Sequence, residues 1–425
     1  MELHVVRPGD TLYELAREYG VSMDRLLQDN QLPDPSQLVV GQVILVRRPA
    51  LAHAVKEGDT LWSVARSYQV SPDQLLRNNP GLRGEDRLFP GQVLVIRYQE
   101  EPRGALTVNA YAYPSIDKAL LTAALPYLSQ LTPFTFQFTA DGALLPPEDG
   151  ALTQAALQAG VAPMLHLSSL SDGGFSGALV HQLLSDEAAR DRLIDAVAGA
   201  ARAGGYRGVD VDFEFVYGQD AEPYADFLSQ LRRAVSPLPL TVALAPKQSD
   251  GQAGRLYEGL DFSLLAQAAD FALLMAYDWG WAGGPPGPVS PLSQVRRSVE
   301  YAMTYFPPER LLLGVPNYGY DWPLPYREGN RAVSVDHVRA VRLAWDRHAA
   351  IRWDQEAQAP WFPYVDGEGR RREVWFEDAR SWAAKIGLAL DYGLAGIGVW
   401  NLDRPFPQGW AALSSLAEIR PGLSG

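Results

Sequence analysis

Three carboxylates alternate with apolar residues in one short segment of the chain, residues 207–216 (RGVDVDFEFV). Because a β-strand directs alternate side chains to the same face, Asp210, Asp212 and Glu214 should lie together on one face. Burying like charges side by side costs free energy and raises the pKa of at least one of them. A carboxyl that stays protonated near neutral pH suits general acid catalysis, so Glu214, the outermost, is predicted to be a proton donor. Asp212 is expected to orient a bound group, and Asp210 to share a proton with Asp212.

The one-strand arrangement restricts the chemistry of such a site. Glycosidases that use two carboxylates hold them on opposite sides of the scissile bond, which neighbours on one strand cannot easily do. A glycosidase built on this segment would therefore take its nucleophile from elsewhere, and the 2-acetamido oxygen of the substrate is a candidate. A structural ion-pair network is disfavoured because no Lys or Arg is interleaved. A metal site is disfavoured because no His accompanies the segment, so we expect no metal and no cofactor.

Composition excludes several other classes of function. Lys and Arg number 37 against 50 Asp and Glu, a net charge of −13, which argues against nucleic acid or an anionic membrane as partner. The absence of cysteine excludes disulfides and thiolate chemistry. No stretch is apolar and long enough to insert into a membrane, and the first residues, MELHVVRPGDTL, lack the features of a signal peptide. Non-classical export, a signal already removed, or action inside a cell that later lyses remain open.

An internal repeat occupies the amino-terminal part of the chain. Residues 4–30 return as residues 53–79, and each copy reads as a strand, a Gly-Asp-Thr turn, two helices and a closing strand. Thr11 and Thr60 are placed to cap the first helix of each copy. The pattern predicts two small α+β modules over residues 1–48 and 52–98.

From residue 104 to residue 425 apolar, strand-like runs alternate with amphipathic helical patterns. The candidate strands are residues 106–113, 134–139, 161–168, 208–215, 240–246, 271–279, 311–322 and 393–400. This alternation predicts a (β/α)8 TIM barrel, with a doubly wound open sheet as the alternative. The interval 323–390 is too long for one crossover helix, so it should hold a small α+β insertion that walls the barrel mouth. Glu214 then lies at the carboxyl end of the fourth strand, where barrel active sites are found.

The carboxylate row resembles the signature of family 18 glycoside hydrolases, a chitinase-like family. Asp210-x-Asp212-x-Glu214 after Gly208 is similar to the family pattern Asp-Gly-x-x-Asp-x-Asp-x-Glu. The resemblance implies hydrolysis with retention at an N-acetylated sugar, with Glu214 as general acid/base and Asp212 holding the acetamido group. Arg207 stands where many members have the first Asp. By the period of the strand it should face away from Glu214, and its effect on the substrate stays open.

Further motifs extend this resemblance over most of residues 104–425. Met275-Ala-Tyr277-Asp278 resembles the family's Met-x-Tyr-Asp, in which the tyrosine hydroxyl binds the acetamido group. Trp400 ends the last strand, where the family has the tryptophan under the sugar, and Gly-Val-Pro-x-Tyr318-Gly resembles the seventh-strand motif. The resemblance therefore implies a catalytic role for Tyr277 and substrate contacts for Met275, Asp278, Tyr318 and Trp400.

The two repeats resemble LysM modules, which bind polymers of N-acetylglucosamine in a groove between the first loop and the loop before the last strand. The residues that this resemblance assigns to glycan binding are Gly9, Asp10, Thr11 and Asn30 in the first copy and Gly58, Asp59, Thr60 and Asn79 in the second.

Two LysM modules ahead of such a catalytic domain resemble the spore cortex-lytic N-acetylglucosaminidases of endospore formers. The resemblance implies a monomeric glycosidase associated with the cell wall or spore, acting on peptidoglycan or a chitin-like polymer. A chitinase is the nearest alternative. A non-catalytic wall protein that uses the barrel to bind glycan is the alternative from another class, and it is disfavoured because Glu214 is present.

Overall fold

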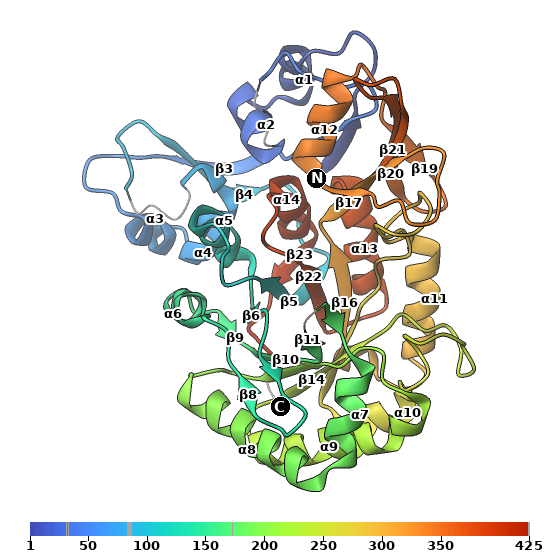
Figure 1. Ribbon diagram of the computed structural model, residues 1–425. Coiled ribbons are helices and arrows are strands. Elements are labelled where there is room, and N and C mark those ends of the chain that lie inside the picture. Colours follow the sequence, from blue (N-terminus) through green and yellow to red (C-terminus); the bar gives the residue numbers. More distant parts are fainter. Residues whose placement is uncertain (31, 33, 83–86, 172, 424–425) are drawn as a thin grey trace.

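The computed structural model describes residues 1–425 except residues 31, 33, 83–86, 172 and 424–425. A ring of parallel strands with helices around it forms the largest part (Figure 1). Two small α+β modules, drawn in blue, and an antiparallel sheet, drawn in orange, adjoin the ring.

Parallel strands close into the predicted barrel. The strands are β5 (Gly104–Ala112), β6 (Gln130–Pro133), β9 (Ala162–Pro163), β10 (Leu165–Ser168), β13 (Val209–Asp212), β14 (Leu240–Leu244), β15 (Phe271–Leu274), β16 (Leu311–Pro316) and β22 (Gly396–Trp400). Their order is β10-β13-β14-β15-β16-β22-β5-β6-β9, and Met164 alone separates β9 from β10 at the third position of the ring. The ring closes because Phe136, beyond β6, bridges Leu167 of β10 in parallel. The predicted (β/α)8 barrel is therefore confirmed, and the alternative prediction of a doubly wound open sheet is wrong.

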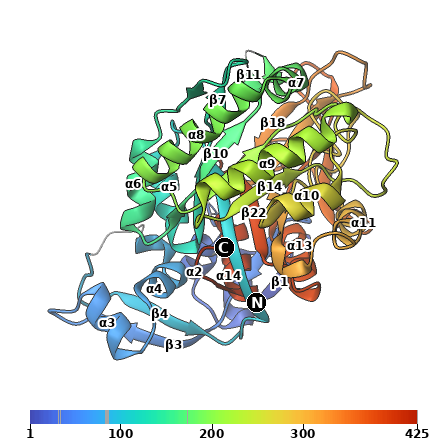
Figure 2. The same ribbon diagram turned by 90° about the horizontal axis from the view of Figure 1, so that it is seen from below.

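Helices cover the outside of the strands, as Figure 2 shows for α8, α9 and α10. The helices of this layer are α5 (Lys118–Ala124), α6 (Gly150–Gln158), α7 (Gly177–Ser185), α8 (Glu187–Ala203), α9 (Ala221–Val235), α10 (Phe262–Ala268), α11 (Leu292–Ala302), α13 (Ala379–Asp391) and α14 (Pro407–Leu416). In α9, Tyr224, Phe227, Leu228 and Leu231 recur at helical spacing and are completely buried. They belong to the same hydrophobic core as the outward side chains of β13, which fixes that strand between the helix layer and the barrel interior.

Short elements connect or extend this layer. They are β7 (Gln137–Phe138) with β8 (Leu144–Leu145), β11 (Leu170–Ser171) with β12 (Gly174–Phe175), β23 (Ala417–Ile419) beside β5, and the 3-10 turns η1 (Pro80–Leu82), η2 (Leu125–Tyr127), η3 (Gly218–Asp220) and η4 (Pro308–Arg310).

The second barrel strand differs from the prediction. We expected it at residues 134–139, whereas β6 ends at Pro133. The sequence pattern does not indicate β6 as a barrel strand, because two of its buried side chains, Gln130 and Thr132, are polar. The hydroxyl of Thr132 lies 2.8 Å from Oδ1 of Asn109 on β5, a pairing that sequence periodicity does not report.

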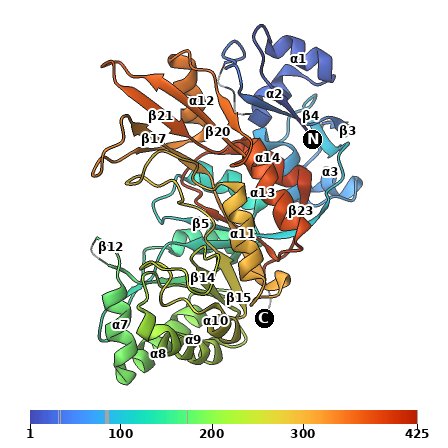
Figure 3. The ribbon, with the colours of Figure 1, turned by 90° about the vertical axis from the view of Figure 1, so that its right-hand side faces the viewer.

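The predicted α+β insertion between the seventh and eighth barrel strands is confirmed, but it runs from β17 (Tyr318–Pro323) to β21 (Arg371–Trp375) rather than over residues 323–390, because α13 belongs to the helix layer of the barrel. Between these two strands it contains β18 (Val333–Asp336), α12 (His337–Asp346), β19 (Arg352–Asp354) and β20 (Ala359–Val365). The strands form an antiparallel sheet in the order β18-β17-β21-β20-β19, which stands beside the barrel in Figure 3. The predicted strand 311–322 is too long, because β16 stops at Pro316. Asn317 then donates through Nδ2 to the carbonyl of Asn401, at 2.7 Å, and the chain starts β17.

Each amino-terminal module has the predicted strand–helix–helix–strand order. The elements are β1 (Glu2–Val5), α1 (Leu12–Tyr19), α2 (Met23–Asn30) and β2 (Val43–Val46), then β3 (Pro49–Ala54), α3 (Leu61–Ser67), α4 (Pro72–Asn78) and β4 (Val93–Tyr98). The predicted caps are confirmed. Thr11 accepts the backbone N–H of Glu14 at 3.2 Å, and Thr60 accepts that of Ser63 at 3.0 Å.

The first module is docked on the barrel and the insertion. Val43 and Leu45 of β2 are completely buried against alanines of α13 and α14. The amide of Gln408 on α14 donates to Oδ1 of Asn30 at 2.8 Å, and the N–H of Ile351 in the insertion donates to the carbonyl of Val40 at 2.9 Å. Apolar burial and buried hydrogen bonds together hold this module in one orientation.

A buried ion cluster joins the two modules. Asp29 accepts from Nη2 of Arg47 at 2.7 Å and from Nη1 of Arg25 at 3.3 Å. The guanidinium of Arg47 also lies 4.2 Å from the ring centroid of Tyr98 in β4 of the second module. Because these charges are buried and paired, the loss of one partner would be strongly destabilising.

Gly41 provides a test of the docking. Its φ is +86° and a Cβ there would lie 1.8 Å from the carbonyl oxygen of Ile351, whereas the equivalent Gly91 of the second module has φ +87° and open space around it. Both Gly→Ala changes should cost about 1 kcal/mol through the left-handed backbone. Gly41→Ala should in addition displace the first module, so it should lower the thermal midpoint more and expose the short connection between β2 and β3 to proteolysis. Equal effects of the two substitutions would contradict the docking.

Candidate functional site

The carboxylate row lies where it was predicted. Asp210 and Asp212 are 2% and 6% exposed on β13, while Val209 and Val211 on the opposite face are completely buried toward the helices. Glu214 follows the end of the strand and is half-buried. The row therefore runs from the barrel interior to the carboxyl end of the fourth strand.

The ends of this segment differ from a regular strand. Alternation stops at Phe215, whose φ of +59° turns the chain into the following loop. Arg207 is exposed before the start of β13, and its backbone N–H donates to the carbonyl of Pro163 at 2.7 Å. Arg207 therefore lies at the opposite end of the strand from Glu214 and outside β13, so the strand period from which we predicted its direction does not extend to it.

Side chains from two other barrel strands contact the deepest carboxylate, one from the adjacent strand β10 and one from β5 across the barrel. The hydroxyl of Tyr111, on β5, donates to Oδ2 of Asp210 at 2.7 Å. Nε2 of His166, on β10, lies 3.8 Å from Oδ2 of Asp210 and 3.7 Å from Oδ2 of Asp212. The prediction that no histidine accompanies the row is wrong, because the parallel register sets His166 beside Asp210.

His166 is a neutral partner and not a counter-ion. Burial lowers its pKa to about 3, and its Nδ1 lies 2.6 Å from the hydroxyl of Thr135. An uncharged imidazole cannot neutralise the aspartates. The charge of the row is consequently governed by the protons that it holds.

The two aspartates are poised to hold such a proton. Burial raises the pKa of Asp210 to about 7, against the hydrogen bond from Tyr111, which acts to lower it. Burial, and then repulsion by Glu214 and Asp210, raises the pKa of Asp212 well above its usual range. Oδ1 of each aspartate is buried without a hydrogen-bond partner among the described residues. When two neighbouring carboxyls are buried and repel each other in this way, at least one of them tends to keep its proton near neutral pH.

The pKa of Glu214 is raised mainly by burial, and not by the other carboxylates of the row. Burial raises its pKa to about 7, and repulsion by Asp278 contributes next. The expectation that repulsion within the row holds the proton on Glu214 is therefore corrected. The row raises the pKa of Asp212, whereas Glu214 responds to a carboxylate that follows the sixth barrel strand.

Tyr277 lies beyond β15 and faces the row. The carboxylates of Asp212 and Asp278 contribute, after burial, to raising its pKa well above the usual range, so the phenol keeps its proton. Its hydroxyl has no hydrogen-bond partner among the described side chains and is free to donate to a ligand. A Cβ at position 314 would approach Cε1 of Tyr277 to 2.8 Å, which explains the glycine of β16. Met275 is half-buried two residues earlier and bonds the carbonyl of Leu244 through its N–H at 2.9 Å.

Asp278 and Tyr318 form a second polar pair. The hydroxyl of Tyr318 donates to Oδ1 of Asp278 at 2.7 Å, and the guanidinium of Arg404 lies 5.7 Å from the ring centroid of Tyr318. Tyr318 is buried at the start of β17, whereas Asp278 is exposed and has a φ of +62°. The insertion therefore orients the carboxylate that repels Glu214.

Trp400 belongs to a cluster of aromatic side chains that lies beside the carboxylate row. Its ring centroid lies 4.9 Å from that of Phe134, 5.6 Å from that of Tyr111 and 6.1 Å from that of Tyr113. The indole is half-buried at the end of β22, so part of it remains accessible to a sugar ring. Tyr111 contacts both this cluster and Asp210, which couples the aromatic surface to the carboxylate row.

The module residues predicted to bind glycan fall into two groups. Gly9, Asp10 and Thr11 form the turn before α1, and Gly58, Asp59 and Thr60 form the equivalent turn before α3. The carboxylate of Asp10 accepts the N–H of Arg7 and contacts His4, each at 2.8 Å. Asp59 accepts the N–H of Lys56 at 2.7 Å and contacts His53 at 2.8 Å. These carboxylates shape the turns.

Asn30 and Asn79 are placed differently. Asn30 is 2% exposed, and its amide bonds the carbonyls of Leu26 and Leu45 and the N–H of Leu45. Asn79 makes the same bonds to Leu75 and Val95 in the second module. Because both amides join the second helix to the last strand, their positions argue against glycan contacts and favour a structural role. Exposed Tyr13 and Trp62, each one residue into the following helix, are the aromatic surfaces that the sequence analysis omitted.

Tyr111, His166 and Thr135 are the site neighbours that sequence analysis missed. A signal for the first two was present, since Tyr111 and His166 sit at inward positions of their predicted strands. No group of three or more His, Asp or Glu side chains that could hold a metal ion occurs in the part of the chain that the structure describes. No described helix is long and apolar enough to cross a membrane.

A closed parallel barrel with an acidic row at the carboxyl end of its fourth strand holds these carboxyls where barrel enzymes have their active sites. The family model described as "Glycosyl hydrolases family 18" matches residues 168–404, and the LysM domain model matches residues 4–47 and 53–97. The chain belongs to glycosyl hydrolase family 18 and is a glycoside hydrolase.

Relatives match the whole chain. The "Cortical fragment-lytic enzyme" of Bacillus subtilis is 40% identical over 423 residues, which cover 97% of each chain. The crystal structure of the Bacillus cereus spore cortex-lytic enzyme SleL has a TM-score of 0.83 at 34% identity, and covers 100% of this chain and 99% of its own. That of the Bacillus megaterium enzyme has a TM-score of 0.84 at 32% identity and 99% coverage of both.

Asp210 permits a test of the electrostatics through stability. An unfolded aspartate titrates near 3.9 and the folded one near 7, so the folded state loses stability as pH rises between these values. Asp210→Asn removes that loss. In urea unfolding it should be more stable than the parent by a few kcal/mol at about pH 8 and little different at about pH 4. The exposed control Asp226→Asn should give the same small change at both pH values. A pH-independent effect of Asp210→Asn would contradict the raised pKa.

Proposed function

We propose that this glycosidase cleaves β-1,4 bonds next to N-acetylglucosamine in the peptidoglycan of the spore cortex. The observation that carries the proposal is Glu214, half-buried at the carboxyl end of β13 with a pKa of about 7. At that pKa the carboxyl is substantially protonated near neutral pH, and it can reprotonate after each turnover.

Glu214 donates its proton to the leaving oxygen as the bond from the anomeric carbon to that oxygen breaks. The carbonyl oxygen of the substrate's own acetamido group attacks the anomeric carbon and forms an oxazolinium ion. Water then opens this ion while Glu214 takes back a proton, so the configuration is retained. Tyr277, with a free hydroxyl, and Asp212, with an unpartnered oxygen, are suited to bind the acetamido group.

Asp278 is the other carboxylate near Glu214. Its Oδ1 accepts the hydroxyl of Tyr318 at 2.7 Å, whereas its Oδ2 bonds none of the described residues. One oxygen is therefore free, and the Asp278→Asn variant decides between a supporting carboxylate and a nucleophile. We assign Asp278 the role of raising the pKa of Glu214, and Met275 and Trp400 contacts with the sugar.

The choice of peptidoglycan rests on similarity over full length. Among the relatives matched along the whole chain, one is named a cortical fragment-lytic enzyme and two solved structures are of spore cortex-lytic enzymes. Two LysM modules would hold the enzyme on the same polymer and raise its effective concentration there. Association with the wall or spore, and action as a monomer, follow as parts of the proposal.

Glu214→Gln tests the assigned acid. The variant should release reducing ends from cortex fragments at least about 100-fold more slowly than the parent, because the amide cannot donate the proton. Binding to insoluble wall material should be unchanged. Glu222→Gln, an exposed glutamate at the start of α9, is the matched control and should keep full activity. Unchanged turnover in Glu214→Gln would refute the assignment. Wall binding without hydrolysis by the parent would favour a binding protein, and faster cleavage of chitin oligomers than of peptidoglycan would favour a chitinase.

Asp278→Asn tests whether Asp278 only raises the pKa of Glu214 or is itself the nucleophile. Glu214 must be protonated for the first step, so the rate falls as pH rises through its pKa of about 7. Removing the repulsion from Asp278 should lower that pKa and move the alkaline limb of the pH–rate profile to lower pH, by of the order of one unit. Tyr318 can still donate to the amide oxygen. Complete loss of activity at every pH would instead identify Asp278 as an essential group and contradict substrate assistance.

A further inference from the structure

His166 has a fixed orientation inside the barrel. It lies on β10 and is 1% exposed. Its ring makes an edge contact with Tyr111, at a centroid distance of 5.5 Å, and a tilted contact with Phe134 at 5.0 Å. Close packing of this kind keeps the plane of the ring in place. Because burial lowers its pKa to about 3, the ring stays neutral and responds to its surroundings through the position of its one proton, on Nδ1 or on Nε2.

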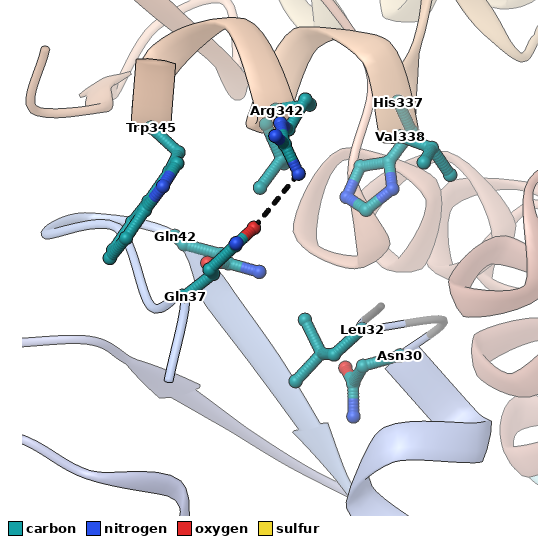
Figure 4. Close-up of a pocket in the computed structure, with 9 residues that line it drawn as sticks. Asn30, Leu32, Gln37, Gln42, His337, Val338, Arg342 and Trp345 are labelled. Atoms are coloured by element: carbon teal, nitrogen blue, oxygen red, sulfur yellow. Dashed lines mark hydrogen bonds between the residues drawn. The ribbon is translucent and has the colours of Figure 1, made fainter. Parts of the chain in front are cut away.

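A second buried histidine shows that burial alone does not create this arrangement. His337 begins α12, in the wall of a cavity of about 190 Å³ between the first module and the insertion (Figure 4). It is 4% exposed, and burial lowers its pKa to about 4. Its Nδ1 has no hydrogen-bond partner among the described residues. Of these two histidines, only His166 has a hydroxyl at one ring nitrogen and carboxylates at the other.

Thr135 can bond either form of the His166 ring. Its hydroxyl oxygen lies 2.6 Å from Nδ1 of His166 and 3.1 Å from the carbonyl oxygen of Phe136. When the hydroxyl donates to Nδ1, the ring proton is on Nε2. When Nδ1 carries the proton and donates to the threonine oxygen, the hydroxyl donates to the carbonyl of Phe136 instead. Both arrangements therefore leave Nδ1 bonded.

The aspartates require a different partner in each of their protonation states. Nε2 of His166 lies 3.8 Å from Oδ2 of Asp210 and 3.7 Å from that of Asp212, so a shift of less than about 1 Å brings it into hydrogen-bond range of either. An ionised pair offers only acceptors, which favours a proton on Nε2. A protonated pair offers an O–H, which favours a bare Nε2. No Lys or Arg in the described part of the chain forms an ion pair with either aspartate, so no fixed positive charge opposes the exchange.

Four other titratable groups face the pair. Three are tyrosines, Tyr111 on β5, Tyr224 on α9 and Tyr277 beyond β15, and burial is the main cause that raises the pKa of each well above its usual range. The tyrosines therefore keep their protons near neutral pH. The fourth is Glu214, which titrates in the same range as the pair.

We propose that His166 is a positioning residue whose tautomer follows the proton of the Asp210–Asp212 pair. When both carboxyls are ionised, the ring carries its proton on Nε2 and donates it to the pair. When one carboxyl is protonated, the ring carries its proton on Nδ1 and accepts the carboxyl O–H at Nε2. The histidine holds one proton in both states, so the proton that the pair gains or loses is exchanged with solvent or with bound substrate.

The value of this exchange for catalysis rests on the proposed function. The oxazolinium ion is positive and forms beside Asp212, which favours the ionised pair, whereas the free enzyme near neutral pH holds a proton there. His166 can bond the pair in both states without a change in its own charge. A side chain that only donates, or only accepts, could bond one state alone.

Nitrogen-15 NMR of the full chain, labelled at its 6 histidines, tests the tautomer without any substrate. Two-bond ¹H–¹⁵N spectra show which nitrogen of each ring is bare. The His166 signals are identified by their loss in His166→Asn or, if that variant fails to fold, by their shift in Thr135→Ser, which keeps the hydroxyl. As pH rises, the bare nitrogen of His166 should change from Nε2 to Nδ1 with a midpoint close to 7, the pKa of Asp210. The His337 signals are the internal control and should not follow this midpoint.

Three variants assign the change to the pair and to catalysis. Asp210→Asn removes one of the two carboxyls and should move the midpoint by about one pH unit or more. Glu214→Gln should keep the tautomer change, because the pair is intact. His166→Phe keeps a ring without nitrogens. It should lower kcat at least about tenfold and change KM by less than about twofold, because the buried ring does not contact substrate.

Three outcomes would overturn the assignment: one tautomer of His166 at every pH, an unaltered midpoint in Asp210→Asn, or an unchanged kcat in His166→Phe. A tautomer change in a parent enzyme that releases no reducing ends would sustain the coupling and refute the proposed hydrolysis. Hydrolysis with a fixed tautomer would refute the coupling alone.

Discussion

Dehydration of the carboxylate row on β13 is the constraint on which the rest of the site depends. Asp210 and Asp212 are buried in the barrel with a neutral histidine beside them, so protons and not counter-ions limit their charge. The hydrogen bond from Tyr111 and the outward packing of Val209 and Val211 hold the row in that environment. The barrel supplies what a free strand could not, because parallel neighbours on both sides fix the row while its last member reaches the mouth.

The insertion influences the outer end of this row, where Glu214 is found, and the first module packs against the insertion. The insertion begins with Tyr318, which orients Asp278, and Asp278 raises the pKa of Glu214. The first module is fixed against the same insertion and against α14, so its surface keeps a defined position relative to the barrel mouth. A glycosidase arranged in this way has a binding surface that moves with its active site, rather than one tethered by a flexible linker.

The sequence predicted features that follow from local periodicity. The alternation of Asp210, Asp212 and Glu214 identified both the strand and its polar face, and the Gly-Asp-Thr turns identified the helix caps. Prediction from the sequence failed for features that depend on contacts between segments far apart in the chain. Buried Thr132 hid the second barrel strand, and the register that sets His166 beside Asp210 joins distant segments. Asn30 and Asn79 are buried because each amide joins the second helix of its module to the last strand. Repulsion between Glu214 and Asp278 was equally invisible, since it depends on two loops that meet only in the folded barrel.

The central claim is that Glu214 carries a proton near neutral pH. Carbon-13 NMR titration of side-chain carboxyls in the full chain tests it most directly, with Glu214→Gln to assign the signal. If Glu214 holds a proton near neutral pH, one carboxyl resonance should titrate with a midpoint close to 7 and should be missing in the variant. A Glu214 signal that titrates below about 5, as exposed glutamates do, would show that Glu214 is ionised at neutral pH and is not the proton donor.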